Sequence, residues 1–84
     1  MIELDGNAVA GKLHEVFGDE MTTATTICAH CGDRRVVAEL VAYVRAPGIV
    51  VRCRTCAGLL MVLVEVRGIT CVDLSGLARF DGRQ

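Results

Sequence analysis

The apolar positions near the start of the chain predict a helix. Over residues 5–17 they recur at the spacing of three and four that places side chains on one face of a helix. Asp5 suits the N-cap position and Gly18 suits the residue after the last turn. We therefore expect an N-terminal helix over residues 5–18 that packs on the sheet which follows. The apolar stripe consists of Val9, Leu13, Val16 and Phe17.

From residue 25 onward, apolar and β-branched runs separated by turn residues predict strands. Ala46-Pro47-Gly48 and Arg67-Gly68 are the expected turns. The tail from Ser75 is expected to fray beyond Phe80. The pattern predicts a small, β-rich α+β fold, with the N-terminal helix followed by an antiparallel sheet. The expected strands are 25–27, 36–44, 49–52, 59–66 and 69–74.

Two pairs of cysteines carry the main chemical signal. Cys28 and Cys31 form one Cys-x-x-Cys pair, and Cys53 and Cys56 form the second after 21 intervening residues. Zn²⁺ prefers four thiolates in a tetrahedron, and two such turns facing each other make a zinc ribbon. We expect one structural zinc ion in a ribbon over residues 24–74.

A site filled by four thiolates has no open position for water or substrate, which argues against hydrolytic chemistry. No nucleophile, general base or carboxylate pair is evident elsewhere, so no catalytic residue and no small-molecule substrate are expected. A catalytic disulfide is also disfavoured, because both pairs lie between strands and not at a helix N-terminus. Release of zinc on oxidation stays open as a minor alternative.

The length of 84 residues fits a single domain over residues 1–84. The acidic start, with neither a basic segment nor an apolar leader, predicts the reducing cytoplasm, where such cysteine pairs bind metal. The longest apolar run, residues 59–64, is too short to cross a bilayer. It lacks polar alternation, which predicts burial on both faces of its strand. Part of that burial can come from a second copy or a protein partner.

Three side chains have competing interpretations. Cys71 has no cysteine at metal-binding spacing, so we expect it to be a small buried core residue. His30 lies inside the first cysteine pair, and we expect an exposed residue and not a ligand, because four thiolates satisfy zinc. His14 lies beside the helical stripe and is expected to be solvated.

The charge is unevenly distributed. The first 20 residues carry one lysine and five acidic residues, whereas the remainder carries eight arginines and five acidic residues. Four thiolates and one Zn²⁺ together carry a charge of −2, which lowers the excess of positive charge on the remainder of the chain by two. Only a weak electrostatic footprint for nucleic acid therefore remains. Nucleic-acid contact is therefore the alternative, and solvated arginines are the favoured interpretation. The arginines that could converge are Arg34, Arg35, Arg45, Arg52 and Arg54.

The chain resembles the zinc-ribbon superfamily over residues 24–74. More narrowly, it resembles a family of short uncharacterised proteins of high-GC Gram-positive bacteria. That resemblance implies a cytoplasmic ribbon preceded by a helix, and it implies no activity. The motifs that carry it are Leu4-Asp5-Gly6-Asn7-Ala8, Cys28-Ala29-His30-Cys31-Gly32, Arg45-Ala46-Pro47-Gly48 and Cys53-Arg54-Thr55-Cys56.

Together these observations predict a structural-zinc binding module that acts through a protein partner or as a homodimer. A nucleic-acid-associated or transcription-accessory zinc ribbon is the alternative function. An enzyme is the least favoured class, and no contact with a membrane is expected.

Overall fold

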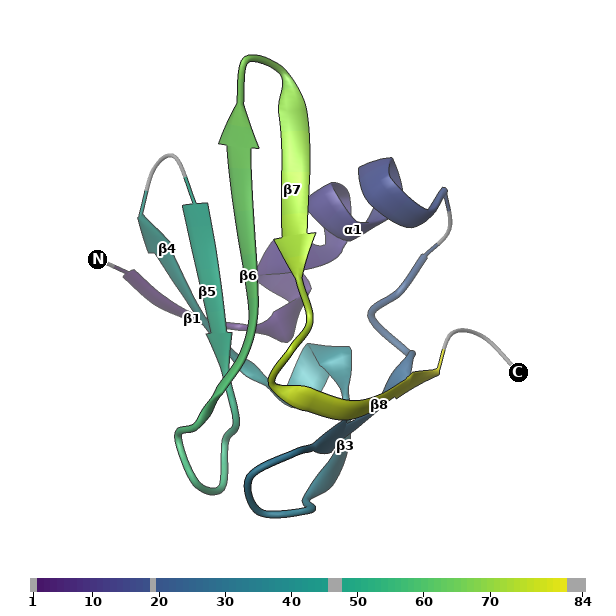
Figure 1. The fold of residues 1–84 in the computed structure, drawn as a ribbon, viewed down its shortest axis with the longest axis vertical. Coiled ribbons are helices and arrows are strands. Elements are labelled where there is room, and N and C mark those ends of the chain that lie inside the picture. Colours follow the sequence, from purple (N-terminus) through teal and green to yellow (C-terminus); the bar gives the residue numbers. More distant parts are fainter. Residues whose placement is uncertain (1, 19, 46–47, 82–84) are drawn as a thin grey trace.

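Two antiparallel sheets and an N-terminal helix make up the part of the chain that the computed structural model describes, residues 2–18, 20–45 and 48–81 (Figure 1). The strands are β1 (Ile2–Asp5), β2 (Thr25–Cys28), β3 (Arg34–Val36), β4 (Val41–Arg45), β5 (Gly48–Arg52), β6 (Leu59–Val66), β7 (Ile69–Asp73) and β8 (Leu77–Asp81). The helical elements are η1 (Gly6–Val9), α1 (Ala10–Phe17) and η2 (Val37–Glu39). The larger sheet has the order β1-β4-β5-β6-β7, and the smaller has β3-β2-β8. The fold is therefore small α+β and rich in strands, as the sequence predicts.

The helical segment begins at Gly6, directly after the predicted cap Asp5, and residues 2–5 form β1 beside β4. Asp5 still caps the helical segment, since its Oδ1 accepts a hydrogen bond from the Asn7 backbone N–H (3.1 Å). The first turn, however, is the 3₁₀ helix η1. The helix ends at Gly18 as predicted, with a left-handed φ of 73°.

The predicted apolar stripe is only half buried. Val9 and Leu13 are fully buried, whereas Val16 is 39% and Phe17 is 41% exposed. The Phe17 ring makes an edge-on contact with Phe80, with ring centroids 5.6 Å apart. The end of α1 therefore packs on β8 of the smaller sheet, an element that the sequence did not predict.

The predicted strand over residues 36–44 is interrupted. Its first part belongs to β3 in the smaller sheet and its second part to β4 in the larger sheet, and η2 carries the chain between them. The side chains of Val37 and Leu40 are buried at this crossing. β-branched residues favour strand conformation locally, but they do not indicate a change of sheet.

The tail is more ordered than predicted. β8 pairs with β2, and Phe80 lies opposite Thr26, so the expected fraying beyond Phe80 is wrong for residue 81. β6 has the predicted bounds, and the two-residue turn Arg67-Gly68 joins it to β7 with positive φ at both positions. The predicted Ala46-Pro47-Gly48 turn lies partly outside the described residues, which resume at Gly48.

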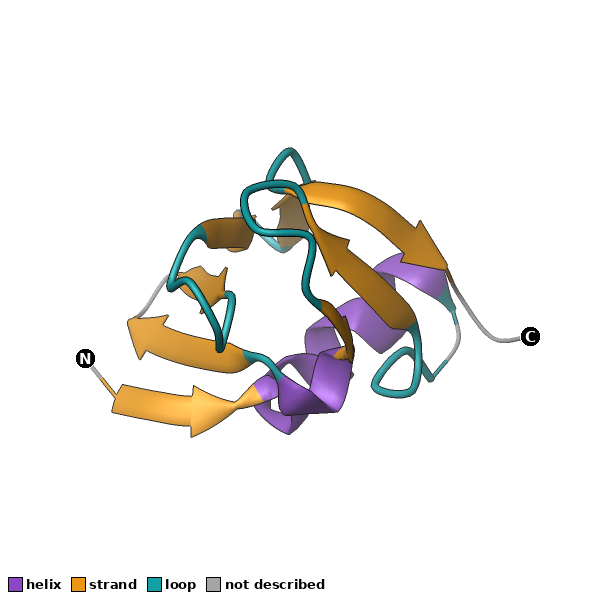
Figure 2. Cartoon of the chain, turned by 90° about the horizontal axis from the view of Figure 1, so that it is seen from below, coloured by secondary structure: helices purple, strands orange, loops and turns teal. Residues whose placement is uncertain are grey.

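The core lies between the larger sheet, α1 and the two short 3₁₀ helices η1 and η2. Figure 2 shows these elements from below, with the helices along one side of the strands. Met61 and Leu63 of β6 point into the core together with Val51 of β5 and Leu13 of α1. The alternation of buried and half-buried residues along β6 assigns its two faces. No helix in the described part of the chain has the length and hydropathy needed to cross a membrane.

Candidate metal centre

The four paired cysteines lie in two loops that face each other. Cys28 is the last residue of β2, and Cys31 lies in the loop that leads from it to β3 in the smaller sheet. Cys53 and Cys56 belong to the loop between β5 and β6 in the larger sheet. The two loops lie side by side at the lower end of the molecule in Figure 1. The cluster therefore joins the two sheets. We call each of these loops a knuckle.

The four sulfur atoms have the spacing that a tetrahedral ion requires. All four Sγ atoms lie within 4.8 Å of one another. Cys28 Sγ is 3.7 Å from Cys56 Sγ, and Cys31 Sγ is 3.6 Å from Cys53 Sγ. A metal–sulfur bond of about 2.3 Å gives tetrahedral S–S separations of about 3.8 Å, whereas a disulfide needs about 2.05 Å. The residues present therefore fit a tetrahedral metal ion, and all the paired cysteines are free thiols.

Backbone N–H groups point at the sulfurs within each knuckle. The N–H of His30 donates to Cys28 Sγ (3.3 Å), and the N–H of Thr55 donates to Cys53 Sγ (3.4 Å) at the equivalent position of the second knuckle. The N–H of Gly58 donates to Cys56 Sγ (3.4 Å). These donors offset the negative charge of thiolate ligands and fix their orientation.

The pKa values of the thiols show why a cation suits the cluster. Burial raises the pKa of Cys28, but the N–H groups of Cys31 and His30 outweigh it and lower that pKa to about 7. The N–H of Asp33 lowers the pKa of Cys31, but burial and the neighbouring thiols raise it to about 12. The four thiols cannot all ionise side by side unless a cation compensates their charge.

Side chains at matching positions also connect the two knuckles. His30, two residues after the first cysteine of its pair, reaches across to the start of β6, directly after the second knuckle, where Nε2 lies 3.1 Å from the main-chain oxygen of Leu59. Thr55, two residues after the first cysteine of the other pair, donates its hydroxyl to Asp33 Oδ2 (2.8 Å). In both knuckles, the side chain two residues after the first cysteine therefore contacts the facing segment.

The sequence prediction that His30 is exposed is confirmed, but its contact with the facing segment was missed. Asp33 and Thr55 were missed as well. The only sequence signal for these contacts was that a residue with a hydrogen-bonding side chain occupies the third position of both Cys-x-x-Cys pairs. Gly58 makes room for this arrangement, because a Cβ there would lie 2.6 Å from His30 Cδ2.

Three of the five arginines that could converge are held by hydrogen bonds at the knuckles or to the neighbouring η2. Arg35 pairs with Asp33 (2.5 Å), Arg52 donates to the main-chain oxygen of Ala57 (3.0 Å), and Arg54 donates to that of Glu39 (2.7 Å). Arg34 and Arg45 are exposed on other parts of the sheets. The structure therefore brings Arg35, Arg52 and Arg54 to the metal centre.

The prediction for Cys71 is wrong, because its thiol is exposed and not buried in the core. It lies in β7, where Thr70 and Val72 take the half-buried positions and Ile69, Cys71 and Asp73 the exposed ones. The register with β6, which pairs Cys71 with Val64, decides the face. Local alternation alone could not assign it. His14 is exposed, as predicted.

The second knuckle holds a strained residue that glycine should relieve. Gly32 and Ala57 each lie four residues after the first cysteine of their pair, with φ of 78° and 62°. Alanine pays about 1–2 kcal/mol in this left-handed region, whereas glycine does not. We expect Ala57→Gly to raise the free energy of unfolding by about 0.5–1 kcal/mol, measured by chemical denaturation of the metal-loaded protein.

Ala29→Gly is the matched control, because Ala29 lies in the first knuckle without a positive φ. It should lower the free energy of unfolding by about 0.5–1 kcal/mol. Equal destabilisation by both substitutions would contradict the strain at Ala57.

The fold and the cysteine cluster together define a small module that can hold a metal ion between two sheets. The chain belongs to the family described as "Family of unknown function (DUF6510)", whose model matches residues 1–84. No curated protein and no solved structure matches the chain.

Proposed function

We propose that this protein is a cytoplasmic binding module whose fold depends on one structural zinc ion held by Cys28, Cys31, Cys53 and Cys56. The observation that supports it best is the convergence of the four Sγ atoms within 4.8 Å from two sheets that the knuckles join. Zinc is the commonest occupant of two facing Cys-x-x-Cys turns. A bound zinc ion would supply folding free energy and a fixed orientation of the two sheets.

The proposed role is protein interaction and not catalysis. Four thiolates complete a tetrahedral zinc ion, so no coordination position is left for water or a substrate. The polar side chains at the knuckles are engaged with the framework: His30 with Leu59 and Thr55 with Asp33. The module would therefore act by presenting a surface, with a protein as its partner.

One observation favours a second candidate, association with nucleic acid. Arg52 and Arg54 are oriented by main-chain carbonyl oxygens and not by carboxylates. A carbonyl fixes a guanidinium group without neutralising its charge, so both cations could still meet phosphates. Against this, Arg35 is paired with Asp33, and zinc tetrathiolate is itself an anion.

Native mass spectrometry of the protein purified at low salt tests the proposal. The expected result is one zinc ion per chain and no bound nucleic acid. One iron ion per chain would mean that the same site holds iron and not zinc. Co-purified nucleic acid would favour the second candidate function. A metal-free chain with disulfides among the four cysteines would overturn the structural-metal proposal.

A further inference from the structure

The larger sheet has one face that the described elements leave uncovered. We call it the outer face; the register of β4–β7 places on it Arg45, Gly48, Val50, Val62, Val64 and Asp73, together with Tyr43 beside Val50 and Cys71 beside Val64. On the opposite face of β6, Met61 and Leu63 are 1% and 2% exposed. The Lys12–Glu65 ion pair places α1 on that opposite face as well.

The composition of the outer face is unusual for a surface in contact with water. Val50, Val62 and Val64 are half-buried by their neighbours in the sheet, yet none of them packs against the buried core cluster. A sheet face in water normally carries polar side chains in alternation with the buried ones. β6 instead carries apolar side chains on both faces as far as Val64, which indicates that this face is covered in the functional state.

The register of the strands makes this face complementary to itself. Gly48 lies opposite Val64 across the β5–β6 pair, and Val50 lies opposite Val62. Consider a twofold axis that runs parallel to the strands between β5 and β6. It places Val64 of a second copy over Gly48, where there is no side chain, and it places Val62 of that copy over Val50. Symmetry makes each contact twice.

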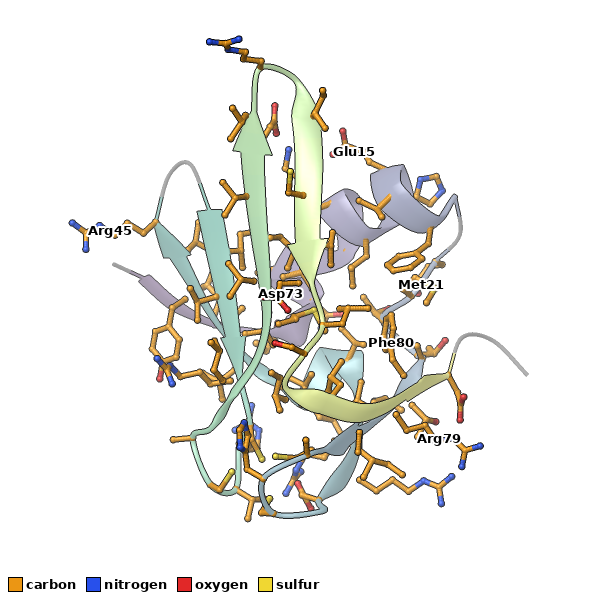
Figure 3. All side chains as sticks on the ribbon, in the orientation of Figure 1. Glu15, Met21, Arg45, Asp73, Arg79 and Phe80 are labelled. Atoms are coloured by element: carbon orange, nitrogen blue, oxygen red, sulfur yellow. The ribbon has the colours of Figure 1, made fainter. Side chains whose placement is uncertain are left out.

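The charges at the two sides of the outer face complement each other under the same operation. Arg45 lies on β4 beside Gly48, and Asp73 lies on β7 beside Val62. Figure 3 shows Arg45 pointing away from the molecule at the end of β4, with Asp73 at the lower end of β7. The twofold axis exchanges the two sides of the sheet, so Arg45 of one copy lies over Cys71 of the second copy, two residues along β7 from Asp73. The long Arg45 side chain can span this offset to Asp73, so the opposite charges favour the arrangement that brings β4 of one copy to β7 of the other.

We propose that the outer faces of two copies pack against each other and form a symmetric homodimer. The proposal names the partner of the binding module and rests on that proposed function. The apolar centre supplies the affinity and the Arg45–Asp73 contacts favour the placement of β4 of one copy over β7 of the other. The metal centres lie at one end of each sheet, so a dimer built on this face leaves both knuckles accessible.

Sedimentation equilibrium of the metal-loaded protein tests the proposal. The wild-type protein is expected to be a dimer at micromolar concentration. Val64→Lys, at the centre of the outer face, should raise the dissociation constant by about tenfold or more, because two lysines would enter an apolar contact. Ala78→Lys is the control, since Ala78 is exposed on β8 of the smaller sheet and should leave the dimer unchanged.

A charge exchange keeps the test valid if Val64→Lys fails to fold. Arg45→Asp should weaken the dimer, and addition of Asp73→Arg should restore it. A monomeric wild-type protein at high micromolar concentration would overturn the proposal, and so would dimers unaffected by Val64→Lys and Arg45→Asp. Metal content, read separately by native mass spectrometry, distinguishes these failures from a failure of the zinc assignment.

Discussion

Replacing Cys53 by serine is expected to unfold the protein. Cys53 is buried at the junction of the two sheets, 3.6 Å from Cys31 in Sγ–Sγ distance, and serine offers no thiolate. Structural zinc contributes about 10–16 kcal/mol of apparent binding free energy in small domains, which matches or exceeds the whole stability of a domain, about 5–15 kcal/mol. Loss of the ion should therefore remove the cooperative unfolding transition, measured by circular dichroism during heating.

Cys71→Ser is the matched control for this experiment. It makes the same chemical change at an exposed thiol outside the cluster. We expect it to keep one zinc ion per chain and to change the free energy of unfolding by less than about 0.5 kcal/mol. A Cys53→Ser protein that binds no metal and still unfolds like the wild type would show that the fold does not depend on the ion.

Gly76→Ala is expected to destabilise the protein strongly. Gly76 lies between β7 and β8, where its N–H donates to the oxygen of Leu60 (3.1 Å) and its oxygen accepts from the N–H of Ala29 (3.0 Å). Through these two hydrogen bonds Gly76 connects β6, the strand after the second knuckle, to the first knuckle. A Cβ at this position would lie 1.9 Å from the oxygen of Leu59 and 2.7 Å from the Cα of Leu60.

Both atoms that the new methyl group would meet are backbone atoms, so no side-chain rotation can relieve the overlap. The segment would have to move away from β6, and both hydrogen bonds would weaken. We expect a loss of about 3 kcal/mol or more in the free energy of unfolding, together with weaker retention of metal in a chelator titration.

Gly11→Ala is the control, because a Cβ there meets nothing within 4 Å and Gly11 lies in α1. It should raise the free energy of unfolding by about 0.5–1 kcal/mol through helix propensity. Equal effects of the two substitutions would contradict the close approach at Gly76.

The four candidate ligands could be named from the sequence, because the chemistry of a Cys-x-x-Cys turn is local. Two cysteines three positions apart reach one ion whenever the chain turns tightly, and the spacing shows this directly. The capping role of Asp5, the end of the helix at Gly18 and the bounds of β6 are also local properties, and the structure confirms all three.

The contacts around the ligands could not be predicted in the same way. His30 meets Leu59 and Thr55 meets Asp33 across more than 20 residues of sequence, so their proximity exists only once the two knuckles face each other. The exposure of Cys71 depends on the register between β6 and β7, since a shift of one residue would have placed it in the core.

The sequence by itself determined the helix, most of the strands and the four cysteines that can hold a metal ion, because capping, alternation and ligand spacing act over a few residues. Tertiary structure alone decided that the chain divides into two sheets at η2, that β8 completes the smaller sheet, and that Gly76 must pass closely beside β6. These features arise from backbone pairing between distant segments, which no local pattern records.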